Sequence, residues 1–168
     1  MTPEFSRPFD IRQLDHRAVQ LVANQAERSA LARRFGIVRI DRLEAEVVLE
    51  RAGEALNGTG TLEADIVQSC AVSAEDLPVQ IREPLAFRFV PETGEHRPDE
   101  EVELDADELD EIEFSGTTVD LGEAVAQSVA LAIDPFLTGP DAEAARKLLN
   151  DENASPFAAL AALKKDLN

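Results

Sequence analysis

Few side chains in this sequence, apart from carboxylates, could act as nucleophiles, bases or metal ligands. There is one cysteine, Cys70, and there are two histidines, His16 and His96. A lone cysteine cannot form an internal disulfide bond or build a cysteine-rich zinc site. A catalytic thiolate needs a nearby base, and neither histidine is near Cys70 in the sequence. We interpret Cys70 as a small buried residue near a strand end, and we predict no catalytic residue, metal site or cofactor.

Carboxylates dominate the charge of the chain. Its 168 residues include 34 Asp and Glu but only 16 Lys and Arg, a formal net charge of −18. Twelve of the acids lie within residues 92–113, where Arg97 is the one opposing charge. Like charges repel and leave little apolar surface to bury, so we predict a solvated loop at about 92–111. The alternatives are a docking segment for a basic protein and a mimic of nucleic acid.

Arginines gather in the first third of the chain. Residues 1–51 hold nine Arg against eight acids. Ion pairs with nearby acids and the dipole of a helix could account for this cluster. Bidentate contacts to phosphate could account for it as well. On the second interpretation the candidate RNA-binding residues are Arg28, Arg33, Arg34, Arg39 and Arg42.

The apolar pattern and the motifs of the sequence exclude several classes of protein. No window approaches the roughly 18 apolar residues that cross a bilayer, and the N-terminus shows no secretory signal. The chain carries no Gly-rich phosphate loop and none of the common hydrolase or metalloprotease motifs. We therefore expect a cytoplasmic protein that is not an enzyme, with no membrane contact and no small-molecule substrate.

Local signals predict the elements of the first half. A strand is expected over Phe5–Ile11, interrupted by Pro8, and a second around Val19 and Leu21. A helix is expected over Gln25–Phe35, because Asn24 and Glu27 form a capping box and Gly36 can end the helix. Alternating apolar residues then predict strands around 43–49, 62–66 and 79–89, with Glu83 as the one exception in the last. Turn chemistry is expected over 54–60.

The second half predicts a short strand at 112–114 followed by helices. Asp120 and Glu123 form another capping-box pattern, and Pro135 ends the helix that it starts. A further short helix is expected at 141–149. The fold class is therefore α+β, a curled antiparallel β-sheet meander with three to four packed helices. Whether the sheet closes into a barrel is left open.

The last residues are predicted to form a separate unit. A single domain is expected over 1–150, followed by a linker and a C-terminal amphipathic helix within 151–168. The helix would pack on its own sheet or dock in the groove of a partner. For the second alternative the candidate partner-binding residues are Phe157, Leu160, Leu163, Lys164 and Lys165.

An ordered set of segments carries a family resemblance over roughly residues 20–167. It comprises Cys70–Ser73, Phe87–Pro91, the acidic loop, Val119–Val125, Leu131–Phe136 and Ser155–Lys164. This set resembles the YceD family, the large-ribosomal-RNA accumulation proteins of bacteria and plastids. Many members carry Cys-x-x-Cys where this chain has Cys70 and Ser73, so the thiolate zinc site of those members is not available here.

The resemblance implies a non-enzymatic factor in ribosome biogenesis. It would support the accumulation or processing of large-subunit (23S) ribosomal RNA. The implied partners are that RNA or its precursor and basic ribosomal proteins. The alternatives are an acidic protein-binding adaptor or nucleic-acid mimic unrelated to ribosomes, and a small metal-dependent hydrolase.

Overall fold

The computed structural model describes residues 3–92 and 110–150. Its centre is a five-stranded sheet in the order β2-β3-β4-β5-β6, and the sheet is open. The strands are β2 (Ala18–Val22), β3 (Arg39–Ala52), β4 (Ala55–Ser69), β5 (Asp76–Pro91) and β6 (Asp110–Phe114). A second sheet pairs β1 (Pro8–Asp10) with β7 (Thr118–Asp120). The predicted α+β class is confirmed.

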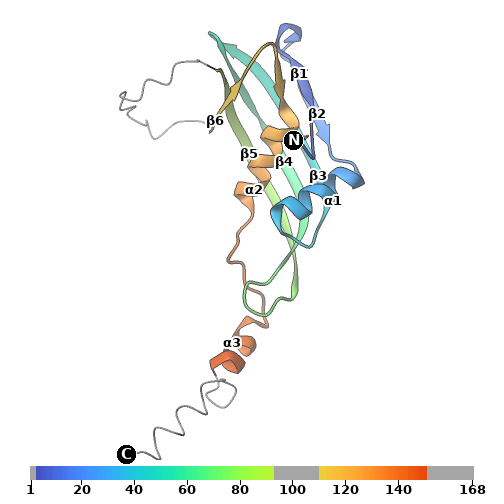
Figure 1. Cartoon of the computed structure of the whole chain (residues 1–168), viewed down its shortest axis with the longest axis vertical. Coiled ribbons are helices and arrows are strands. Elements are labelled where there is room, and N and C mark those ends of the chain that lie inside the picture. Colours follow the sequence, from blue (N-terminus) through green and yellow to red (C-terminus); the bar gives the residue numbers. More distant parts are fainter. Residues whose placement is uncertain (1–2, 93–109, 151–168) are drawn as a thin grey trace, which may run out of the picture.

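One face of the large sheet is covered. The helices α1 (Gln25–Phe35) and α2 (Leu121–Ala132) lie against it, whereas α3 (Ala142–Asn150) lies beyond the end of the sheet, past the β4–β5 turn (Figure 1). The core on the covered face takes alternate residues of β3, β4 and β5, such as Val47, Leu62 and Phe87. This alternation is the usual pattern of a sheet with one wet face.

The strand pairing corrects one expectation. β2 to β5 pair antiparallel as predicted, but β6 pairs parallel to β5, with Phe89 opposite Ile112. A parallel neighbour requires a crossover rather than a hairpin, and residues 93–109 provide the connection. The predicted acidic loop falls almost entirely on these residues, which lie outside the described part of the chain.

Two glycines correct the expectation of a turn at 54–60. The β3–β4 turn lies at Gly53 and Glu54, and β4 begins at Ala55. Gly58 and Gly60 are inside that strand. A Cβ atom on Gly58 would lie 2.2 Å from the Phe87 ring, and one on Gly60 would lie 1.8 Å from the carbonyl oxygen of Glu46. These glycines therefore allow close packing within the sheet rather than a change of direction.

The helix boundaries follow their predicted signals. At α1, the Asn24 side chain accepts a hydrogen bond from the Glu27 N–H, the Glu27 carboxylate accepts one from the Asn24 N–H, and Gly36 is left-handed with φ 67°. α2 begins after its cap Asp120, which accepts from the Glu123 N–H, and ends before Pro135. The predicted capping box is only half formed there, because the Glu123 carboxylate accepts from Arg34 instead. The first strand is shorter than expected, because a 3-10 turn at Ile11–Gln13 follows Asp10.

Candidate functional surfaces

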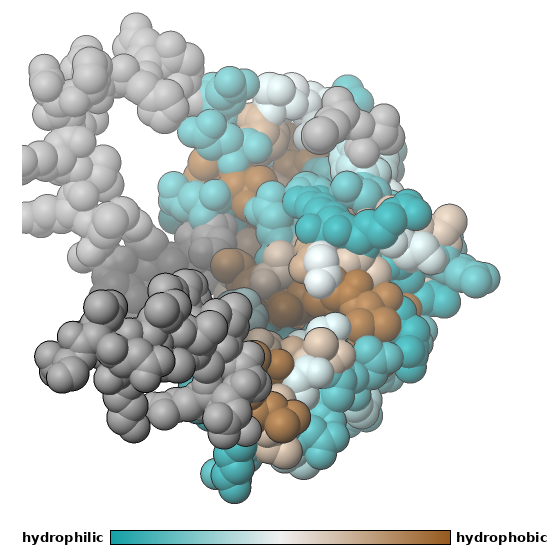
Figure 2. Space-filling view, turned by 60° about the horizontal axis from the view of Figure 1, so that its bottom comes forward, coloured by the Kyte–Doolittle hydropathy of each residue, from teal (hydrophilic) through white to brown (hydrophobic). Residues whose placement is uncertain are grey.

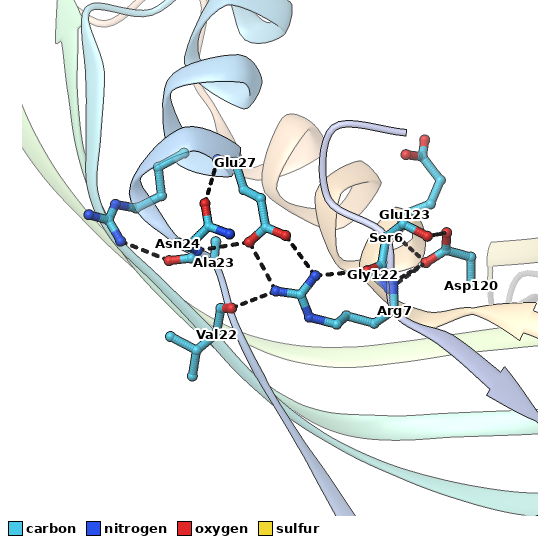
Figure 3. Close-up of polar contacts among 10 residues, drawn as sticks. Ser6, Arg7, Val22, Ala23, Asn24, Glu27, Asp120, Gly122 and Glu123 are labelled. Carbon is cyan, nitrogen blue, oxygen red and sulfur yellow. Dashed lines mark hydrogen bonds and ion pairs between the residues drawn. The ribbon is translucent and has the colours of Figure 1, made fainter. Parts of the chain in front are cut away.

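The N-terminal segment joins the starts of both helices. Arg7 donates to both carboxylate oxygens of Glu27, at 2.7 and 2.9 Å, and to the Val22 carbonyl (Figure 3). Asp120 accepts from the Ser6 hydroxyl at 2.6 Å and from the N–H groups of Arg7 and Gly122. The Arg7 hydrogen bonds hold the pKa of Glu27 below its usual value. These part-buried contacts brace the N-terminal segment against the starts of α1 and α2, and they leave little polar capacity for a ligand.

The predicted RNA-binding arginines do not form one patch. Arg28, Arg33 and Arg34 are on α1, while Arg39 and Arg42 are on β3. Arg34 donates to Glu123 at 2.7 Å and to Glu4 at 3.1 Å, and the Glu123 hydrogen bond raises the pKa of Arg34. Arg34 therefore ties α1 to α2.

The other candidate arginines differ in the hydrogen bonds and ion pairs that their side chains form. Arg28 donates to the Ala23 carbonyl, and Arg39 pairs with Asp41 at 2.9 Å. Arg42 bridges Asp65, Glu63 and Glu44. Among the five candidates, only Arg33 is exposed and has a side chain with no hydrogen bond or ion pair to a described residue.

Within residues 3–92 and 110–150, acids gather on the face of the large sheet opposite α1 and α2. The side chains opposite the core alternate along β3, β4 and β5, and strand pairing places Glu44 beside Glu63. Five carboxylates and three arginines lie at these positions: Glu44, Glu46, Glu50, Glu63, Asp65, Arg42, Arg82 and Arg88. We call this set the open face.

The open face has charges that are only partly neutralised. Glu63 accepts from Arg82 at 2.8 Å and from Arg42 at 2.9 Å, and these hydrogen bonds lower its pKa. Glu46 instead accepts from the Gln20 amide, which carries no charge. A shallow depression of about 220 Å³ lies between Gln20, Glu46, Thr61 and Glu63. Its polar lining suits ammonium and guanidinium groups, which donate to carboxylates.

The surroundings of the Cys70 sulfur are more polar than the sequence indicates. It is buried, with 4% of its surface exposed, directly after β4. Its sulfur accepts hydrogen bonds from the N–H groups of Val72, Ser73 and Gly139 at 3.3 to 3.5 Å. The Ser73 side chain and these backbone donors lower the pKa of Cys70 to about 7, against the effect of burial. The sulfur thus links the β4–β5 turn to the segment before α3.

Other predicted sites are placed as follows. His16 is exposed in the loop before β2, with φ 58°, and His96 lies outside the described residues. Within residues 3–92 and 110–150, no three His, Cys, Asp or Glu side chains lie close enough to hold a metal ion. No helix in this part of the chain is long and apolar enough to cross a membrane. The candidates Phe157, Leu160, Leu163, Lys164 and Lys165 lie beyond it.

A family model for "Large ribosomal RNA subunit accumulation protein YceD" matches residues 58–164. The match covers more than half of the chain, from within β4 through α3, so the chain belongs to the YceD family. No curated protein and no solved structure matches the chain. The family name links the protein to the accumulation of large-subunit ribosomal RNA. The α1 arginines and the β3 part of the open face precede the matched residues.

Proposed function

We propose that this protein supports the accumulation of large-subunit ribosomal RNA by binding a basic ribosomal protein on its open face, and that it catalyses no reaction. The observation that carries the proposal is a sheet face that no helix of the described residues covers, on which the five carboxylates of the open face outnumber its three arginines. Ribosomal proteins with Lys- and Arg-rich segments are complementary to such a surface. Charge complementarity would speed their encounter and favour the correct partner.

A protein contact is favoured over a direct RNA contact. The net charge of −18 repels phosphate, and the arginines that could overcome this repulsion are mostly engaged. Arg34 and Arg42 already hold two or more carboxylates each. An RNA contact from α1 would therefore depend on Arg33, and we propose it only as a secondary contact beside the bound ribosomal protein.

The described titratable groups give little support for a catalytic function. The partners of the Cys70 sulfur are backbone N–H groups and Ser73, none of which can act as a base at neutral pH. The carboxylates of the open face are spread along strands, and Glu44, Glu63 and Asp65 among them are paired with arginines. The proposed role is that of a cytoplasmic assembly factor that works by binding.

The experiment compares a tagged wild-type protein with a variant that combines Glu44→Lys, Glu46→Lys and Glu50→Lys. Both are isolated from lysate at low salt with and without ribonuclease, and large-subunit precursors and their proteins are quantified. We expect the wild type to retain ribosomal proteins after ribonuclease treatment and the variant to lose them. Loss of all ribosomal material from the wild type on ribonuclease treatment would instead indicate that RNA is the partner, and would contradict the proposal.

A further inference from the structure

The charged side chains of the open face are not all engaged in the same way. Most of them hold an ion pair or a hydrogen bond to another side chain of the sheet: Arg42, Arg82, Glu44, Glu46, Glu63 and Asp65. The side chains of the two remaining members, Glu50 and Arg88, form neither with a described residue. Their capacity for hydrogen bonds is therefore free for a partner.

Strand register places these two side chains in one row across the sheet. Glu50 on β3 lies opposite Asn57 on β4. Arg88 on β5 lies beside Asn57, and Glu111 on β6 lies beside Arg88. We call these four residues the polar row. None of their side chains makes a hydrogen bond or an ion pair with the part of the chain that the structure describes.

Unmet hydrogen bonds, rather than charge alone, distinguish the polar row. In Figure 2, hydrophilic residues make up much of the described surface around a few exposed apolar ones, so a polar side chain by itself marks no site. The Asn57 side-chain oxygen and the Arg88 Nε, however, are shielded from solvent and have no partner within residues 3–92 and 110–150. An unpaired buried acceptor or donor costs free energy that a bound segment can recover. Both residues are only partly buried, so a rotation of the side chain can present these atoms to a partner.

The groups of the polar row match those of a basic peptide segment. The Asn57 oxygen can accept a hydrogen bond from a backbone N–H, and the Arg88 Nε can donate one to a backbone carbonyl. Glu50 and Glu111 are exposed at the two ends of the row, where their carboxylates can accept from lysine or arginine side chains. The row thus offers two carboxylates for cations and, between them, one acceptor and one donor for a peptide backbone.

The spacing of the two carboxylates favours an extended segment. Neighbouring strands lie about 4.8 Å apart, so the three steps from β3 to β6 separate the backbones of Glu50 and Glu111 by about 14 Å. An extended chain advances about 3.3 Å per residue and covers this distance in about four residues. A helix advances about 1.5 Å per residue and needs about nine. A helix would also keep its backbone N–H and carbonyl groups paired within itself, away from Asn57 and Arg88.

We propose that an extended segment of the partner, with two cations about four residues apart, lies across the polar row. This inference rests on the proposed function and names the part of the open face that holds the basic protein. The chain's own segments outside the described residues do not supply the pattern. Residues 93–109 carry eight acids against one arginine, which the carboxylates of the row would repel. Residues 151–168 carry two lysines, Lys164 and Lys165, whose adjacent positions do not match the spacing.

The first test is a nuclear magnetic resonance titration of the isotope-labelled full chain at low salt with two synthetic peptides. Both peptides contain two lysines among the same threonines and valines; three residues separate the lysines in one, and the lysines are adjacent in the other. We expect the peptide with separated lysines to bind at least about threefold more tightly and to shift the amide signals of the polar row. Equal binding of the two peptides, or shifts confined to another surface, would overturn the proposal.

The second test removes the carboxylates in matched pairs. Glu50→Gln with Glu111→Gln should weaken binding of the separated-lysine peptide and of RNA-free large-subunit proteins by about fivefold or more. The control, Glu44→Gln with Asp65→Asn, changes the net charge by the same amount. It should stay within about twofold of wild type, because these two acids already pair with Arg42.

The two pairs also separate this inference from the proposed function. Equal weakening by both pairs would contradict the assignment to the polar row while the proposed function stood. A wild type that binds the peptide at the row but binds no ribosomal protein would support the row and contradict the proposed function.

Asn57→Ala gives a result that a merely structural role would not. Because the Asn57 oxygen has no described partner in the free protein, its loss should leave the melting temperature unchanged or raised while it weakens peptide binding by about threefold. Thr59→Ala, at an exposed position on the same face of β4, should change neither. A lower melting temperature of Asn57→Ala with unchanged peptide binding would rule out its place in the site.

A last variant asks whether the chain's own end occupies the row. Lys164→Ala with Lys165→Ala in the full chain should leave the affinity for the separated-lysine peptide unchanged. A rise in affinity of about tenfold would show that these lysines compete for the polar row, and would overturn the choice of partner.

Discussion

The two faces of the large sheet use the same strands for different purposes. On the covered face, Val47, Leu62 and Phe87 are at most 2% exposed. On the other face, the intervening positions carry carboxylates and arginines such as Glu46, Glu63 and Arg82. Burial of apolar surface stabilises the fold, whereas exposed ion pairs contribute little. The alternation of residues along each strand thus separates stability from the binding that we propose.

The separation has a practical consequence. Substitutions on the covered face should change the free energy of unfolding and leave binding intact in whatever protein still folds. Substitutions on the open face should weaken binding and leave the free energy of unfolding nearly unchanged. Each prediction below tests this division, in order of decreasing expected effect on stability.

Phe87→Ala should cause the largest loss of stability. The ring is 2% exposed, lies over Gly58, and packs edge-on against Phe89 with 5.4 Å between centroids. Its removal should lower the free energy of unfolding by about 3–5 kcal/mol, because a cavity remains. Chemical denaturation measures the change. Thr61→Ala on the open face is the control and should stay within about 0.5 kcal/mol of wild type.

Asp120→Ala should have the next largest effect. Asp120 caps α2 and also holds Ser6 and the Arg7 backbone. Loss of a cap and of part-buried hydrogen bonds should cost about 1–3 kcal/mol in thermal or chemical unfolding. Asp120→Asn retains one acceptor oxygen and should restore most of this stability. Equal destabilisation by both variants would mean that the charge, and not the hydrogen bonds, braces the N-terminal segment.

Arg33→Glu and Arg34→Glu should differ in their effects on stability and on association with ribosomal precursors. Arg34 bridges Glu123 and Glu4 with 34% of its side chain exposed, so its reversal should cost roughly 1 kcal/mol after screening by solvent. Arg33→Glu should leave the melting temperature unchanged, since Arg33 pairs with no described residue. If only Arg33→Glu lowers co-sedimentation with ribosomal precursors, the secondary RNA contact is supported. No change in either variant would remove it.

Cys70→Ala should give the smallest effect at pH 7 and below, and its effect should grow as the pH rises. The pKa of Cys70 is lowered from 9.0 to about 7 in the folded protein, so the thiolate is favoured by folding. The difference in unfolding free energy between wild type and Cys70→Ala should therefore rise from pH 7 to pH 9, and should fall as the pH drops through 7. A difference independent of pH would show that the sulfur acts only by packing.

The sequence predicts elements best where their signals are local. Asn24, Glu27 and Gly36 lie within the turns that begin and end α1, and their predicted roles are confirmed. The same local reasoning predicts a turn at Gly58 and Gly60, and this prediction is wrong. Their role depends on Phe87 and Glu46, which lie on neighbouring strands far away in the sequence. The parallel pairing of β6 likewise depends on a partner across a long connection.

The candidate site was harder to predict for a related reason. By sequence, Arg34 is a candidate for RNA contact or for an ion pair with a nearby acid, but its partner Glu123 lies 89 positions away. Arg42 has its strongest partners on the next strand, at Glu63 and Asp65. Alternation along β3 did reveal that Glu44 and Glu46 share a face. The family resemblance supplied the role, which neither charge nor periodicity could indicate.

The most direct test of the open face is a binding measurement with purified proteins. The RNA-free proteins of the large ribosomal subunit are titrated against the wild type, the Glu44→Lys, Glu46→Lys, Glu50→Lys variant and Arg33→Glu, at two salt concentrations. We predict that the wild type and Arg33→Glu bind with similar, salt-sensitive affinity and that the triple variant binds at least about tenfold more weakly. Equal binding by the triple variant and the wild type would contradict the account.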